Sequence, residues 1–121
     1  MYCDGGRDRD ERRDCAVRAF ATAWEIPYYQ AYDIFEWGGR RPNHGVRLAT
    51  FQRLFKSLGM TRCENLEGIT VNQFCKGGYK GQYLITVSGH ALCVKDSVVF
   101  DKAPTKRART CYIWQIPQSR G

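Results

Sequence analysis

The fold is decided by residues 82–101, which read QYLITVSGHALCVKDSVVFD. Apolar and β-branched residues fill most of this stretch, a composition that is typical of buried strands. Asp96 and Ser97 interrupt it at a point suited to the two-residue loop of a hairpin. A further apolar run, CYIWQI, follows at 111–116 and predicts a last strand. The second half of the chain therefore predicts a small antiparallel sheet.

Amphipathic helices are expected before these strands. The first begins after Asp14, a favourable N-cap residue. Its apolar residues recur on one helical face, at Val17, Phe20, Ala21 and Trp24. The second starts at Pro27 and stops at Gly38, and the third ends at Gly59. With a short capped turn over residues 70–76, the pattern predicts an α+β fold whose N-terminal helices pack on the antiparallel sheet.

The 121 residues suffice for one hydrophobic core, so we expect a single domain over 1–121, with 1–13 as a charged N-terminal segment. Hydrophobic residues make up 43% of the chain, which favours a packed globule over a disordered chain. No apolar run reaches the roughly 20 residues of a membrane helix. The charged start does not resemble a secretory signal, so a cytoplasmic location is expected, or a virion if the protein is packaged into a particle.

Six cysteines occur, and in a reducing cytosol they are expected to be thiols rather than disulfides. Cys93 and Cys111 lie in apolar, strand-like runs, so both are expected to be small buried hydrophobic residues. The sequence has no CxxC pair, and its histidines are limited to His44 and His90. We therefore expect no metal and no cofactor.

Three residues carry candidate chemistry. Cys15 falls at the start of the first helix, where N–H groups and the helix dipole stabilise an anion such as a thiolate. His90 follows Gly89 in the strand region, and a neutral imidazole beside a thiol is the usual base in acyl transfer. In the hairpin register Asp101 lies opposite Leu92 and diagonal to His90, where its carboxylate can orient the imidazole. Each residue taken alone is also compatible with a purely structural role.

The chain resembles small papain-like cysteine peptidases of bacteria and phages in two stretches, RRDCAVRAFATAWEIPYYQAYDIF and GQYLITVSGHALCVKDSVVFD. The shared features are a cysteine after an aspartate at a helix start, a Gly-His-Ala strand and an aspartate on the next hairpin. These features are also similar to the bacteriocin-processing peptidase domains of export transporters. The resemblance covers residues 14–35 and 82–101. It implies a papain-like fold with Cys15 as nucleophile, His90 as base and Asp101 as its orienting partner.

One position departs from the papain-like pattern. Such enzymes usually carry a glutamine roughly six residues before the nucleophile, where it helps to hold the oxyanion, and here that residue is Arg9. Loss of a donor of this kind lowers the rate by about 100- to 1000-fold. The backbone N–H of Cys15 still offers a donor, and Arg9 or Arg12 is a candidate substitute. The departure weakens the expectation of activity more than that of the fold.

The leading interpretation is a cysteine hydrolase (a peptidase, isopeptidase or amidase-like enzyme) that acts on a protein or peptide substrate. The alternative is an inactive or weakly active papain-like scaffold that binds a host factor or a virion protein. The net charge of +7 and the basic residues within 102–109 suit an acidic partner or a solubilising surface. Nucleic acid is not the expected partner because the sequence has no recognisable nucleic-acid-binding motif. No membrane partner is expected.

Overall fold

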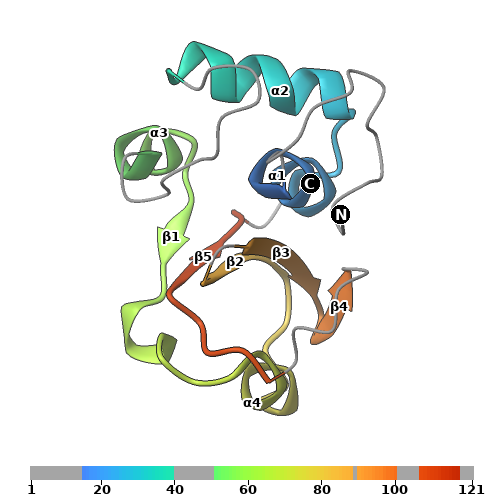
Figure 1. Cartoon of the computed structure of the whole chain (residues 1–121), viewed down its shortest axis with the longest axis vertical. Helices are drawn as coiled ribbons and strands as arrows, with labels where there is room; N and C mark the ends of the chain where they lie inside the picture. Colours follow the sequence, from blue (N-terminus) through green and yellow to red (C-terminus); the bar gives the residue numbers. More distant parts are fainter. Residues whose placement is uncertain (1–14, 40–50, 89, 101–106, 118–121) are drawn as a thin grey trace.

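The helix-rich half of the chain precedes the strand-rich half in a computed structural model, which describes residues 15–39, 51–88, 90–100 and 107–117 (Figure 1). The helical elements are α1 (Cys15–Trp24), α2 (Tyr28–Trp37), α3 (Gln52–Ser57), the 3₁₀-helix η2 (Glu64–Leu66) and α4 (Val71–Lys76). The strands are β1 (Thr61–Arg62), β2 (Gln82–Val87), β3 (His90–Lys95), β4 (Val98–Phe100) and β5 (Tyr112–Gln115). This is the predicted α+β architecture, with β1 and η2 as elements that the sequence pattern did not reveal.

The described strands form one five-stranded antiparallel sheet in the order β1-β5-β2-β3-β4. β2, β3 and β4 pair consecutively, and β5 returns to pair with the other side of β2. β1 pairs with β5 and forms one edge, so β4 forms the other. The strand that begins with His90 therefore lies one position in from the β4 edge.

The β3–β4 hairpin turns at Asp96 and Ser97, as predicted, and Lys95 pairs with Val98. Both turn residues have a positive φ, 48° and 71°, which is unfavourable for residues with a side chain. Gly81 offsets this cost. Its N–H donates to the Asp96 carboxylate at 2.8 Å, and its carbonyl accepts from the Asp96 N–H at 2.9 Å. These bonds fix the turn and with it the strand register.

Two hydrophobic cores lie on the two faces of the sheet. In Figure 1, α1 lies between the sheet and α2, whereas α4 lies on the other side of the sheet. The first core joins α1, α2 and α3 to the sheet, and its large rings are Phe20, Tyr32, Phe35, Phe51, Phe55 and Trp114. The second core joins α4 to the sheet and contains Val71, Phe74, Tyr83, Ile85, Val87, Leu92, Val94 and Ile113. Burial on both faces explains why β2 and β3 read as nearly continuous apolar runs.

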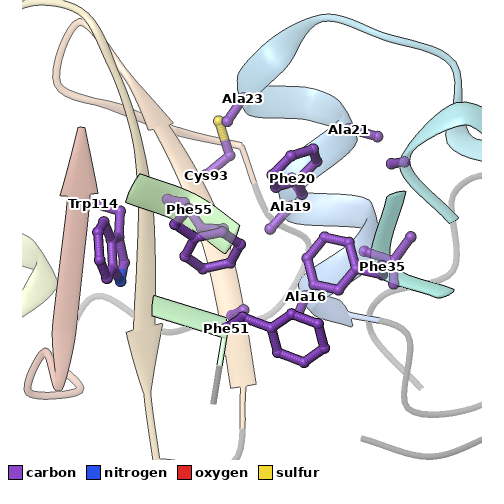
Figure 2. Packing of buried hydrophobic residues seen from close by; sticks show 14 of the residues in the cluster. Ala16, Ala19, Phe20, Ala21, Ala23, Phe35, Phe51, Phe55, Cys93 and Trp114 are labelled. Atoms are coloured by element: carbon purple, nitrogen blue, oxygen red, sulfur yellow. The ribbon is translucent and has the colours of Figure 1, made fainter. Parts of the chain in front are cut away.

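Small side chains allow α1 to lie close to β3. Ala16, Ala19 and Ala23 recur at i, i+3 and i+7 and share a core with Ala91 and Cys93 of β3. Figure 2 shows the Cys93 sulfur beside Ala23. Larger residues at these positions would push the helix away from the strand, because protein interiors have little free volume. The alanine line therefore sets the position of α1 over the sheet.

Most predicted helix ends are confirmed. α2 begins directly after Pro27 and ends at Trp37, with Gly38 as its C-cap. α4 starts with a capping box, in which Thr70 and Gln73 exchange hydrogen bonds between side chain and backbone. α3 ends before Gly59, whose φ of 85° is readily adopted by glycine. Local sequence signals thus determine where these helices stop.

The prediction that Cys111 is buried is wrong. Cys111 is exposed, although its N–H donates to the Thr86 carbonyl at 2.7 Å. The apolar run around it is longer than the strand that forms, because β5 begins only at Tyr112. Cys111 lies just before the strand and belongs to neither core. Cys93, in contrast, is fully buried as predicted.

Phe20→Ala is expected to lower the free energy of unfolding by about 3–5 kcal/mol. The ring is 1% exposed, and its centroid lies 5.0 Å from that of Phe35 and 6.0 Å from that of Phe55. Trp24→Ala is expected to cost less, since Trp24 is only partly buried against the same core. Urea unfolding followed by circular dichroism measures both costs. A larger cost for Trp24 would contradict this placement of the two rings.

Glu67 joins η2 to the strands β1 and β5. Its carboxylate accepts two hydrogen bonds from the Arg62 guanidinium, both at 2.9 Å, and one from the Ile113 N–H at 3.1 Å. Burial by itself raises the pKa of Glu67. The hydrogen bonds from Arg62 and Ile113 outweigh it, so the pKa lies below the ordinary carboxyl value.

Glu67→Ala is expected to lower the free energy of unfolding by about 1–3 kcal/mol at neutral pH, because the Ile113 N–H loses this acceptor. A carboxylate whose pKa is lowered by folding stabilises the fold above its unfolded-state pKa. That contribution is lost as the pH falls through the folded-state pKa, so the difference between parent and variant shrinks in acid. Glu64→Ala is the control, since the Glu64 carboxylate is mostly exposed. A difference that stays constant from about pH 7 to about pH 3 would contradict the role of Glu67.

Candidate active site

Cys15 is the first residue of α1, as predicted, and it is half-buried. In the first turn of a helix the backbone N–H groups have no intrahelical acceptor and point along the axis, so they favour a nearby anion. Asp14, the predicted N-cap residue, lies outside the described residues. The thiol of Cys15 therefore occupies a position that favours its reactive, thiolate form.

Arg18 lies one helical turn after Cys15. Its side chain is 8% exposed, which is rare for an arginine. Residues three apart share a helix face, so Arg18 starts from the same face of α1 as Cys15. The sequence did not reveal its burial, because Arg18 follows a run of charged residues that resembles a solvated surface.

His90 is the first residue of β3 and is 7% exposed. It pairs with Val87, the last residue of β2, so it lies where the β2–β3 hairpin closes. Buried histidines are uncommon compared with aliphatic residues, and a buried imidazole is held in one orientation by its neighbours. The predicted strand position of His90 is confirmed.

The helix α1 and the strand β3 run in the same direction. Glu25, just after α1, accepts hydrogen bonds from Lys95, the last residue of β3, at 3.1 Å and from Gln82 at 2.9 Å. From first to last residue, α1 spans about 14 Å and β3 about 17 Å. Because the two elements have similar lengths and are joined where they end, their first residues, Cys15 and His90, lie at the same end of the pair.

The side chains of Cys15 and His90 nevertheless start from opposite faces of the sheet. Directly paired residues share a face, so the Cβ of His90 lies on the face of Val87, within the α4-side core. The adjacent Ala91 faces the other way and shares the α1-side core with Ala16. The contact between α1 and the sheet therefore does not bring the thiol and the imidazole together.

The other predicted site residues, Asp101, Arg9 and Arg12, lie outside the described residues. The hairpin register from which the position of Asp101 is predicted is confirmed as far as Phe100, which pairs with Cys93. The roles of these three residues remain predictions.

Two of the other thiols, Cys93 and Cys63, have a raised pKa. Burial raises the pKa of Cys93 to about 12. Burial, with a contribution from the nearby Glu67 carboxylate, also raises the pKa of Cys63. Cys111 is exposed. The buried Cys93 and the half-buried Cys63, whose pKa values are both raised, therefore suit structural roles rather than that of a nucleophile.

No protein-family model, curated protein or solved structure matches this chain. None of the described helices is long and apolar enough to cross a lipid bilayer. Within the described ranges, no three His, Cys, Asp or Glu side chains gather into a potential metal site. Function is therefore inferred from the residues of this chain and their geometry.

Cys93 is expected to be the slowest of these thiols to react with iodoacetamide in the native protein, because it is buried and its pKa is about 12. Cys111 is expected to react at an ordinary rate. Peptide mapping by mass spectrometry at about pH 8 distinguishes them. In urea the two rates should converge. Equal rates in the folded protein would contradict the burial of Cys93.

Proposed function

We propose that the protein is a cysteine hydrolase that cleaves peptide, isopeptide or side-chain amide bonds, on a papain-like fold. Cys15 is the nucleophile, His90 carries the proton and Asp101 orients His90. The observation that carries the proposal is the common end of α1 and β3, where a cysteine at a helix start and a buried histidine at a strand start are both found. A thiol and an imidazole are the two groups that this chemistry requires.

The proposed reaction has two steps. In the first, the Cys15 sulfur attacks the carbonyl carbon, the C–N bond breaks, and the thiol proton passes through His90 to the leaving amine. In the second, His90 takes a proton from water, and the water oxygen attacks the thioester. The C–S bond breaks, a carboxylic acid leaves and the thiol is restored. The backbone N–H of Cys15, assisted by Arg9 or Arg12, stabilises the oxyanion in both steps.

The position of the two side chains restricts where a substrate can bind. The thiol comes from the α1 side of the sheet and the imidazole from the α4 side, so the proposal requires both groups to reach one scissile bond at the start of β3. Arg18 is compatible with the proposal, since it is buried one helical turn after Cys15, where a positive charge would favour the thiolate. The proposed enzyme therefore works at the end of the sheet rather than on its face.

Alkylation in mild acid tests the proposed pair. At about pH 6 an ordinary thiol is almost entirely protonated, so rapid iodoacetamide labelling of Cys15 indicates a stabilised thiolate. His90→Ala is expected to slow this labelling by about tenfold or more, because an imidazolium no longer faces the sulfur. Asp101→Ala is expected to slow it less, since the aspartate acts through His90. The exposed Cys111 serves as the internal control in each digest.

Labelling and hydrolysis together have three informative outcomes, provided that each variant has the circular dichroism spectrum of the parent. If Cys15 reacts equally fast in the parent and in His90→Ala, the two side chains do not face each other and the proposed triad is wrong. If the coupling is present and peptide or amide substrates are hydrolysed, with loss in Cys15→Ser, the proposal is supported. If the coupling is present without hydrolysis of peptide, amide or ubiquitin-like substrates, the second candidate below is supported.

The second candidate is a binding protein on the same scaffold. It is favoured by the opposite sheet faces from which Cys15 and His90 start, and by Arg9 at the position of the oxyanion glutamine. Such a protein, of a bacterial or phage type, binds a host factor or a virion protein without cleaving it. Its thiol would then be retained for packing at the helix start rather than for chemistry.

A further inference from the structure

The outward face of α2 carries two aromatic rings, one on each side of a carboxylate. Tyr29, Asp33 and Trp37 recur at i, i+4 and i+8, so they lie in line along the helix over about 12 Å. Trp37 is 80% exposed and Tyr29 is 57% exposed. The opposite face of α2 supplies Ala31 and Phe35 to the core. Packing of the core therefore does not account for the two outward rings.

Exposed aromatic rings of this kind are typical of interaction surfaces. Tryptophan and tyrosine dominate the binding energy of many interfaces, because they bury a large rigid area at a small entropic cost. On the surface of a monomer such rings leave apolar area in water. The two rings lie along one helix face, one turn either side of Asp33, and this strip of three residues can be covered by a single partner segment.

This strip is acidic on a basic chain. α2 contains two acidic residues, Asp33 and Glu36, both of them exposed, and no lysine or arginine. The chain as a whole has a net charge of +7. Carboxylates at the surface repel phosphates and anionic lipids and attract cations. Charge complementarity therefore favours a cationic protein segment over nucleic acid or a membrane.

We propose that the outward face of α2 docks an arginine-bearing segment of a partner protein. A guanidinium group can pair with both oxygens of the Asp33 carboxylate. It can also stack on the flat ring of Trp37 or Tyr29, which an ammonium group does less well. The α2 layer lies on the side of α1 away from the sheet (Figure 1), so docking here does not depend on the chemistry of Cys15.

Short peptides test the proposal on the full-length protein. The probes are three capped peptides of equal length in which glycine alternates with arginine, lysine or glutamate. The indole N–H signal of Trp37 in a nitrogen–proton correlation spectrum, assigned by its loss in Trp37→Phe, reports binding. At low ionic strength the arginine peptide is expected to shift this signal at the lowest concentration, the lysine peptide at a higher one, and the glutamate peptide not at all.

Two variants and a matched control place the binding on this face. Asp33→Asn and Tyr29→Ala are each expected to weaken binding of the arginine peptide by about tenfold, with the fold unchanged because both side chains are exposed. Phe100→Ala removes an exposed ring at the β4 edge instead, and it is expected to have no effect.

Three results would overturn the proposal. The first is equal binding of the arginine and glutamate peptides. The second is unchanged binding of the arginine peptide in both α2 variants. The third is a dimer of the protein alone, found by analytical ultracentrifugation and lost in Trp37→Ala, which would make a second copy of the chain the occupant of this face.

Discussion

The close packing of α1 on β3 is the constraint on which the rest of the structure depends. Alanines on the helix share a core with Ala91 and Cys93 on the strand, and these small side chains let the two backbones approach closely. Glu25 joins the two elements where they end, by accepting hydrogen bonds from Lys95 and Gln82. The aromatic residues of the same core pack around α1, and α2 covers the side of α1 that faces away from the sheet. A bulky residue on the alanine line would therefore disturb the site as well as the core, because it would change where the helix begins relative to the strand.

Much of this architecture could be predicted from the sequence, because its signals are local. The Asp96–Ser97 hairpin, the stop at Gly38 and the cap at Thr70 follow from turn and capping chemistry. The alanine line was not predicted, since alanine is a weak hydrophobic signal beside phenylalanine and tryptophan. β1 is too short to leave a pattern, and the burial of Cys111 was predicted wrongly because an apolar run does not show where its strand begins.

At the candidate site, the sequence predicts the element in which a residue lies but not the face of the sheet to which its side chain points. The sequence placed Cys15 at a helix start and His90 at a strand start, and both placements are confirmed. The sheet face to which the His90 side chain points follows from its pairing with Val87, which belongs to the α4-side core. Strand pairing and core membership are properties of the whole fold. The buried Arg18 is a similar case, because only tertiary packing separates it from the charged run before it.

If Cys15 and His90 face each other at the start of β3, a short bifunctional alkylating agent must be able to join them. Treatment of the native protein with 1,3-dibromoacetone at about pH 6 alkylates a reactive thiol first and then any ring nitrogen within reach of the second arm. Mass spectrometry of the digest identifies the linked peptides. We expect a cross-link between the peptides of Cys15 and His90, which disappears in His90→Ala. Cys15 alkylated by one arm alone, with His90 unmodified in protein of native circular dichroism, would contradict the proposed pair.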